Sequence, residues 1–460
     1  MLDSAMYRNL ENIAKVHSDS YLEHAKHFPE AFERGNFPIR VSSLSELQKL
    51  SNWNHHGILE YYMELFAGFS LDDLEVAVNK FIEFQAIFFN HGESYLALEQ
   101  FFKCFILYKI LDRLNMLDGK NILEIGPGIG LNAFFIGEYT LNYSTVEVAE
   151  SFYLLQNMIN SFLFKDKFKN HIWDTVDKYT NFYACSNQKQ IISPDIYRTK
   201  ETASIHQYPY WKIGDIYSSE VQYDVIMSNA NMLEFNPSAL EDYLELFRVK
   251  LAKNGILLFF CTGNPTFGTP QSLIEKLAEN KFKPLCLFRP GDNYKYLHIS
   301  ADDNKVIVLS AYGDTLKEYV KNYDLESYFD EIYILDDSKT GLFMGKYKFV
   351  NRDEVKKIGI KHGLIMHEKN EIREVFVDIF KELSIQELPL TPPFLQTFGI
   401  FVTDTHDLYN QIDFKTSCPF SFVQKEFSEI LSLFEFSKNK SLYVKDALID
   451  MLFKKQRGKQ

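Results

Sequence analysis

The pattern of apolar and polar positions changes near residue 118. Before that point, apolar residues recur at helical spacing in two segments, 57–90 and 95–116, and no strand-like alternation occurs. After it, short apolar runs alternate with helical segments, in the order 121–125, 131–139, 143–148, 151–164, 223–229, 237–253 and 256–261. Strands that alternate with helices in this way predict an α/β protein with a doubly wound, Rossmann-like parallel sheet.

We predict four parts of the chain. A helical N-terminal region precedes the doubly wound domain, and a small Rossmann-like α/β module and a mostly helical C-terminal segment follow, with bounds of 1–118, 119–302, 303–388 and 389–460. The doubly wound domain is expected to end in an antiparallel pair of strands, 282–288 and 294–300. A polar, tyrosine-rich stretch, 165–210, is too long for an ordinary connection. We interpret it as a substrate lid, with a surface embellishment as the alternative.

Composition and charge exclude several classes of protein. The chain has 460 residues, of which 46% are hydrophobic and 24% charged, as in an ordinary globular protein of several domains. Its formal net charge of −13 argues against a nucleic-acid partner. The five cysteines are far apart and form no CxxC pair, so a reducing compartment is expected. The most apolar run, 101–111, is too short to span a bilayer, and we expect a cytoplasmic protein without a transmembrane segment.

A glycine-rich loop follows the first strand of the doubly wound domain. Glu124 is followed by Gly126, Gly128 and Gly130, and glycines allow a sharp turn and a close approach of the backbone to a ligand. A dinucleotide-binding fingerprint would place its third glycine at position 131, which is Leu131. An NAD-dependent oxidoreductase is therefore disfavoured.

The spacing of Glu124 and the three glycines resembles motif I of the class I S-adenosylmethionine-dependent methyltransferases. The resemblance extends to Glu147, which ends the second strand where the family places the carboxylate that binds the ribose hydroxyls. It includes Asp215, in a segment similar to the one that meets the adenine, and Asn229, which ends the strand facing the methyl-donor centre. The resemblance implies that S-adenosylmethionine is the cofactor. The residues implied to bind it are Glu124, Gly126, Gly128, Gly130, Glu147, Asp215 and Asn229.

Within that superfamily, the chain resembles the sugar O-methyltransferases of bacterial polysaccharide gene clusters. The shared features are the helical N-terminal part, the glycine loop, the helix that contains 153–156 and the strand end at 229–234, and the resemblance covers roughly residues 90–300. It implies methylation of a sugar hydroxyl in polysaccharide or glycan biosynthesis, on a small-molecule or carrier-linked sugar. The alternatives are a methyltransferase for another small molecule or a protein, and an inactive, methyltransferase-like interaction subunit.

Two side chains are candidates for the general base that would deprotonate the acceptor. Glu234 follows the fourth strand, and His206 lies in the segment that leads to Asp215. Alternatively, Glu234 caps the next helix and His206 is an ordinary surface histidine. Asn229 and Asn231 could orient sugar hydroxyls or, with a carboxylate, hold Mg²⁺. No dense cluster of metal ligands is visible, so we assign none.

The small module contains one candidate binding residue. Asp336 follows a strand 23 residues after Gly313, the distance at which a ribose-binding acid would be expected. This module either recognises a nucleotide-sugar or carrier-linked substrate, or extends the fold and pairs subunits in a homo-oligomer. We favour the structural interpretation, because the segment has a single glycine and no phosphate-binding fingerprint.

Overall fold

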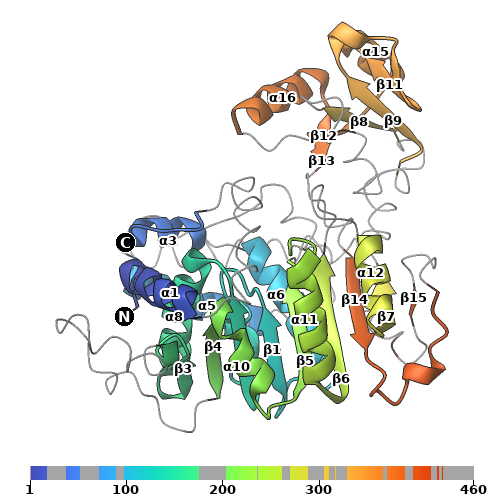
Figure 1. Ribbon diagram of the computed structural model, residues 1–460. Coiled ribbons are helices and arrows are strands. Elements are labelled where there is room, and N and C mark those ends of the chain that lie inside the picture. Colours follow the sequence, from blue (N-terminus) through green and yellow to red (C-terminus); the bar gives the residue numbers. More distant parts are fainter. Residues whose placement is uncertain are drawn as a thin grey trace.

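The computed structural model describes most of the doubly wound domain and parts of the remaining chain. The described residues are 2–17, 38–51, 72–89, 98–175, 204–229, 231–235, 237–261, 270–288, 305–309, 316, 329–365, 370–388, 397–415, 422–423 and 427. They contain two separate β-sheets. Figure 1 shows the larger sheet, with β1, β5 and β6, and the smaller one, with β8, β9 and β12.

The large sheet has nine strands in the order β15-β7-β14-β6-β5-β1-β2-β4-β3. Their bounds are β1 Asn121–Ile125, β2 Asn142–Glu147, β3 Phe168–Asn170, β4 Ile205–Pro209, β5 Tyr223–Asn229, β6 Leu251–Cys261, β7 Lys283–Phe288, β14 Thr397–Val402 and β15 Phe422–Val423. The strands from β3 to β6 pair in parallel, whereas β14 is antiparallel to both β6 and β7. A parallel-dominated α/β sheet was predicted, and the structure confirms it.

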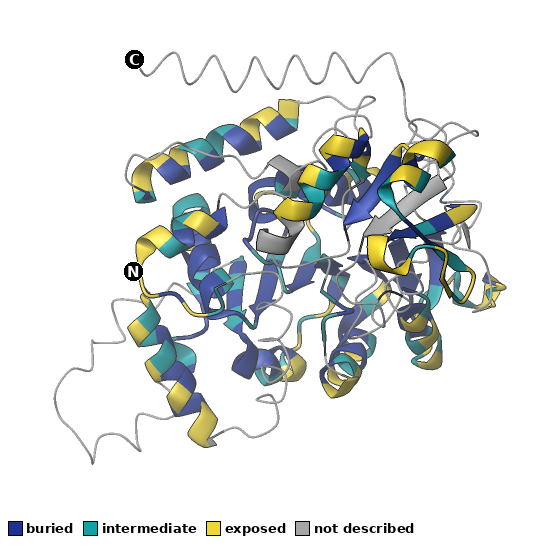
Figure 2. Cartoon of the chain, turned by 90° about the horizontal axis from the view of Figure 1, so that it is seen from above, coloured by how far each residue is buried: buried dark blue, intermediate teal, exposed yellow. Residues whose placement is uncertain are grey.

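Helices cover both faces of this sheet, because its central strands are apolar on both sides. In β1, Ile122 packs into the cluster that includes α5, α6 and α8, whereas Leu123 packs into the opposite cluster with α11 and α12. The helix bounds are α1 Ser4–His17, α3 Leu44–Ser51, α5 Asp72–Phe88, α6 Leu98–Arg113, α7 Ala133–Ile136, α8 Glu150–Phe164, α10 Ile213–Ser218, α11 Pro237–Lys250 and α12 Pro270–Glu279. Figure 2 shows the buried strands between helices that are exposed on their outer sides.

The small sheet has six strands in the order β10-β11-β9-β8-β12-β13. The elements are β8 Lys305–Leu309, β9 Glu331–Leu335, β10 Phe343–Met344, β11 Tyr347–Val350, α15 Arg352–Ile358, β12 His362–Ile365, α16 Asn370–Leu383 and β13 Gln386–Leu388. All neighbours pair in parallel except β10 with β11. Asp336, after β9, accepts hydrogen bonds from the Ser338 backbone N (3.0 Å) and Oγ (2.6 Å). Its carboxylate therefore caps a local turn.

The end of the large sheet differs from the expected antiparallel pair. Strand β7 pairs antiparallel with β14 on one side and with β15 on the other, both in the segment predicted to be mostly helical, and the expected partner 294–300 lies outside the described residues. In the chain, the small sheet therefore lies between β7 and β14 of the large one. The stretch 165–210 is also less irregular than expected, because β3 and β4 belong to the large sheet. Its middle, 176–203, lies outside the described residues, so the lid remains a prediction.

Candidate functional site

The candidate site lies where the direction of winding in the large sheet reverses. From β1 the chain passes to β2 and β4 on one side, and then to β5 and β6 on the other. In doubly wound sheets, ligands bind at such a switch point, beyond the carboxyl ends of the strands. The glycine loop, Glu147 and Asn229 lie at the carboxyl ends of β1, β2 and β5, and β4 leads through the 3₁₀-helix η4 (Tyr210–Lys212) to Asp215. The fold therefore gathers at one edge most of the residues predicted for the cofactor.

The three glycines of the loop have positive φ angles of 63°, 58° and 80° for Gly126, Gly128 and Gly130. Their surroundings differ. A Cβ at Gly126 would lie 1.8 Å from Asn231 Nδ2, and one at Gly130 would lie 2.8 Å from Gln156 Cγ. A Cβ at Gly128 would have no neighbour within 4 Å. Two of the glycines thus allow close packing inside the protein, and the middle one faces open space.

Asn231 holds the glycine loop to the end of β5. Its Nδ2 donates to the backbone oxygens of Ile125 (2.6 Å) and Gly126 (2.8 Å), and its Oδ1 accepts a hydrogen bond from Ser228 Oγ. From the sequence, this amide could orient a sugar hydroxyl or help to hold a cation. In the structure both ends of the amide are engaged within the protein, which favours a structural role for Asn231.

Glu147 accepts four hydrogen bonds at the end of β2. Oε1 accepts from the backbone N of Val148 (2.8 Å) and Ala149 (2.9 Å), and Oε2 accepts from Gly128 N (3.2 Å) and Gln156 Nε2 (2.9 Å). The residue is only 4% exposed. Burial raises the pKa of Glu147 to about 7, although these hydrogen bonds act in the opposite direction. Gln156, which sequence reasoning missed as a site residue, also donates to Gly128 O (2.6 Å).

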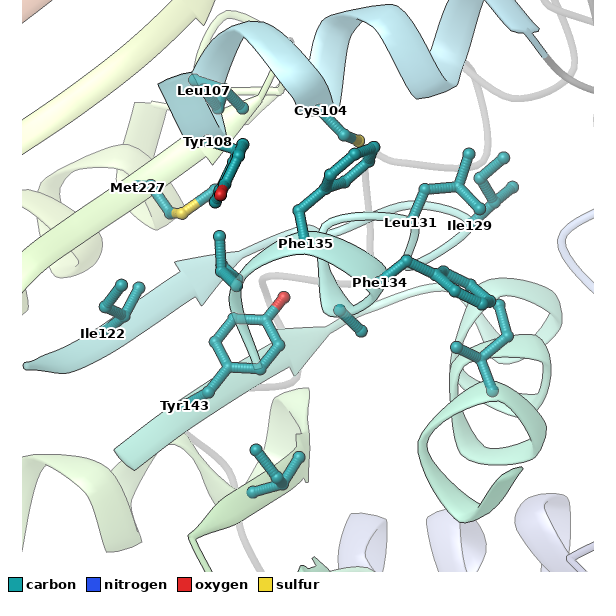
Figure 3. Close-up of a cluster of buried hydrophobic side chains, with 14 of the residues drawn as sticks. Cys104, Leu107, Tyr108, Ile122, Ile129, Leu131, Phe134, Phe135, Tyr143 and Met227 are labelled. Carbon is teal, nitrogen blue, oxygen red and sulfur yellow. The ribbon is translucent and has the colours of Figure 1, made fainter. Parts of the chain in front are cut away.

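Glu124 lies inside the protein and does not border the open space. Its carboxylate accepts hydrogen bonds from Asn132 Nδ2 (2.6 Å) and from the Tyr143 hydroxyl, and the residue is fully buried. Figure 3 shows Tyr143 among the apolar side chains of this region. Burial raises the pKa of Glu124 to about 7. Glu124 thus joins β1, β2 and the segment before α7, and its contact with a cofactor remains a prediction.

Glu234 lies in the turn that follows β5. Its backbone N donates to Asn231 O (2.8 Å), and its side chain is partly buried. Removal from water, and then the negative charge of Glu147, raise the pKa of Glu234 to about 7. Within the described part of the chain, its carboxylate has neither a hydrogen bond nor an ion pair. An acid with a pKa near 7 suits proton transfer at neutral pH.

His206 does not reach this edge. It lies in the interior of β4, paired with Ser144 of β2, whereas Glu147 pairs with Pro209. Three residues along a strand correspond to roughly 10 Å. Its Nδ1 lies 3.0 Å from His171 Nε2, and His171 Nδ1 lies 2.8 Å from Asp174 Oδ2. The geometry thus argues against His206 as the general base.

The two remaining candidates lie near the edge. Asp215 is in the first turn of α10, partly exposed, and forms an ion pair with Lys212 Nζ (3.0 Å). Asn229 is the last residue of β5 and is partly buried. Their contacts with a cofactor remain predictions. In the described residues, no group of three or more His, Cys, Asp or Glu side chains is placed to hold a metal ion. No helix in those ranges is long and apolar enough to cross a bilayer.

Fold and site together define a doubly wound α/β protein with a glycine-loop site rimmed by carboxylates. No family model and no curated protein matches the chain. Among solved structures, it is similar to the DhpI–SAH complex, with 10% identity, a TM-score of 0.26, and coverage of 50% of this chain and 91% of the other. It is also similar to magnesium protoporphyrin IX methyltransferase (ChlM) from Synechocystis PCC 6803 with bound SAM, with 10% identity, a TM-score of 0.25, and coverage of 47% of this chain and 88% of the other. For the glycopeptide N-methyltransferase MtfA, the identity is 8%, the TM-score is 0.25, and the match covers 40% of this chain and 81% of the other. TM-scores this low establish no functional relationship.

Proposed function

We propose that the protein binds S-adenosylmethionine at the carboxyl edge of the large sheet and transfers its methyl group to a hydroxyl oxygen. The observation that carries this proposal is the charge beside the glycine loop. Gly128 borders open space, and its backbone N donates a hydrogen bond to the Glu147 carboxylate. The negative charge of Glu147 in turn contributes to the raised pKa of Glu234. Negative charge favours a cationic ligand such as a sulfonium and opposes a diphosphate.

The same residues argue against a dinucleotide. A pyrophosphate would need free backbone N–H groups at the start of a helix. Here, Gly128 N is engaged by a carboxylate, and α7 is only four residues long. Leu131, at the position of the third fingerprint glycine, is 1% exposed and belongs to the hydrophobic core. The loop therefore fits an uncharged or cationic group better than a phosphate.

The residues present fit the nucleoside part of the proposed cofactor. A carboxylate has about four lone-pair sites, and the hydrogen bonds to Glu147 occupy that number. A ribose hydroxyl must therefore replace one of its donors, and Gln156 Nε2 and Gly128 N, both on Oε2, are the two not fixed by the adjacent backbone. Asp215 would then meet the adenine, and Asn229 would lie on the side of the methyl group.

The bound cofactor would supply an electrophilic methyl group. An acceptor hydroxyl must lose its proton as it reacts, and we assign Glu234 as the base that takes it. Its pKa of about 7 and the absence of a hydrogen-bond partner in the described residues support this role. We further propose a small-molecule or carrier-linked sugar of polysaccharide biosynthesis, methylated in the cytoplasm, as the acceptor. The resemblance of residues 153–156 and 229–234 to sugar O-methyltransferases supports that choice. Another small molecule or a protein as acceptor is the alternative within the same chemistry.

One observation favours a second candidate, an inactive interaction subunit. All acceptor sites of Glu147 are filled by the protein's own donors, as in a loop kept only for packing. Calorimetry separates the two. We expect saturable binding of S-adenosylmethionine and S-adenosylhomocysteine but not of NAD. The Gly128→Asp variant should remain folded and lose that binding, because its side chain would enter the open space with a negative charge. If the wild-type protein gives no heat with S-adenosylmethionine, the methyltransferase proposal is wrong.

A further inference from the structure

The N-terminal helix α1 meets the large sheet at the ends of β2 and β4. Tyr7 is fully buried, with its ring centroid 5.3 Å from that of Tyr153 in α8 and 5.2 Å from that of Trp211 in η4. Figure 1 shows α1 beside α8. One aromatic side chain of α1 is therefore wedged between the element that follows β2 and the element that follows β4.

A network of charges fixes this arrangement. Glu150, the first residue of α8, has a fully buried carboxylate that accepts hydrogen bonds from Arg8 Nε (2.9 Å) and Nη2 (2.9 Å) and from Arg40 Nη1 (2.6 Å). Arg40 Nη2 also donates to Glu11 in α1 (2.7 Å), which accepts a hydrogen bond from the Tyr210 hydroxyl (3.1 Å). Two guanidinium groups thus neutralise two carboxylates, and Arg40 contacts both of them.

The backbone of the N-terminal part contributes as well. The Ile39 carbonyl accepts a hydrogen bond from Ser151 N (3.0 Å), and Arg8 Nη2 donates to the Val41 carbonyl (2.9 Å). The start of α8 is thus held on one side by Glu147, which binds Val148 N and Ala149 N, and on the other by Ile39. The segment that carries Glu147 is fixed at both ends.

From these contacts we infer that α1 and residues 38–41, here called the N-terminal clamp, position the nucleoside side of the cofactor site, with Arg40 as the central positioning residue. The inference rests on the proposed function. The clamp joins the start of α8, which follows Glu147 at the end of β2, to η4, which leads to Asp215 in α10. Loss of Arg40 would remove the side chain that joins Glu150 to Glu11 and leave the buried Glu150 with Arg8 and the backbone N of Val41. The positions of Glu147 and Asp215 would then be less firmly fixed relative to each other.

The variant Arg40→Met tests this, because methionine keeps an unbranched apolar stem but removes every donor. The matched control is Lys80→Met. Lys80 in α5 forms an ion pair with Glu138 (2.8 Å), just before β2 begins and therefore toward the opposite end of that strand. Binding of S-adenosylhomocysteine is measured by calorimetry, and folding by circular dichroism and thermal unfolding. We expect about tenfold weaker binding in Arg40→Met, the effect of losing charged hydrogen bonds, and wild-type binding in the control.

Kinetics distinguish positioning from a general loss of structure. The KM for S-adenosylmethionine should rise in Arg40→Met, with kcat at saturation within about twofold of the wild type. The KM of Arg40→Lys should lie between those of the wild type and Arg40→Met, because an ammonium group keeps the charge but lacks the planar guanidinium fork that bonds to two carboxylates. If Arg40→Met does not fold, Tyr210→Phe removes only the hydrogen bond to Glu11 and should weaken binding about threefold.

The outcomes separate this inference from the proposed function. Wild-type protein that binds no S-adenosylhomocysteine would overturn both. Wild-type protein that binds, together with a folded Arg40→Met or Tyr210→Phe variant of unchanged affinity, would overturn the inference alone. Weaker binding in the clamp variants but not in Lys80→Met supports it.

Discussion

Replacing Gly126 and Gly128 by alanine in turn separates packing from ligand binding, because both have nearly the same φ, 63° and 58°. A left-handed alanine costs about 1–2 kcal/mol at either position. At Gly126, the new Cβ would also displace Asn231 Nδ2, which lies 1.8 Å away. Asn231 would then lose its hydrogen bonds to Ile125 O and Gly126 O, at about 1 kcal/mol each. Gly126→Ala should therefore destabilise the domain by about 2 kcal/mol more than Gly128→Ala.

Guanidinium denaturation followed by tryptophan fluorescence measures this difference. Of the three tryptophans, Trp173 and Trp211 pack in the core beside the large sheet, so their fluorescence reports on the unfolding of that part, and Trp53 lies outside the described residues. In the double variant Gly126→Ala/Asn231→Ala, the penalties should not add, because the hydrogen bonds of Asn231 are lost only once. Gly128→Ala should be the milder change for stability but the more damaging one for binding, since its methyl group enters the open space. Equal destabilisation by the two alanines would show that Asn231 does not contact the loop.

Three further predictions concern the carboxylates. Glu147→Gln should weaken binding of S-adenosylmethionine more than tenfold, because a charged acceptor is worth about 1.5–3 kcal/mol. Asp215→Ala should weaken it less, and calorimetry measures the affinity of both variants. Unchanged affinity in Glu147→Gln would exclude Glu147 as the ribose-binding carboxylate. Glu234→Gln should lower kcat by a factor of about 10²–10⁴ with little change in cofactor affinity. The rate–pH profile of this variant should lose its limb near pH 7. Turnover at the wild-type rate would show that Glu234 has no catalytic role. Burial raises the pKa of Glu124, Glu147 and Glu234 from 4.5 to about 7, so the native state binds more protons than the unfolded state between those values. Stability should therefore fall as the pH rises through that window, and denaturation at pH 5.5 and pH 8 checks the sign.

The features that sequence alone predicted are local in the chain. The glycine loop could be found because a strand, three glycines and a helix follow one another within 121–136, and Glu147 because it ends the next apolar run. Helix α16, Asn370–Leu383, has a regular amphipathic period that marks it as a helix in the sequence. In each case the determining contacts lie within one strand–loop–helix unit, where periodicity carries the information.

The failures come from pairings between distant segments. An apolar run predicts a strand but not its neighbour, so nothing in 397–402 indicated that it pairs with β6 and β7 across the intervening small sheet. The distance of His206 from the carboxyl edge of the sheet depends on its pairing with Ser144 of β2, and the sequence of β4 alone does not specify that register. Asn231 was considered for a ligand role because a polar residue at a strand end has the same sequence signature whether it binds a ligand or a loop. Only its closeness to Gly126 distinguishes the two.

The carboxylates link the stability of the domain to the charge of the ligand. The negative charge of Glu147 adds to the effect of burial in raising the pKa of Glu234, and in the described residues neither carboxylate has a cationic partner. Above pH 7 both ionise, and the uncompensated charge destabilises the native state. A sulfonium or ammonium group bound beside them would relieve that repulsion, whereas below pH 6 the same cation would first have to displace protons. Binding should therefore tighten as the pH rises from 6 to 8 and should release protons. A neutral ligand would show neither effect, because it has no charge to exchange for a proton.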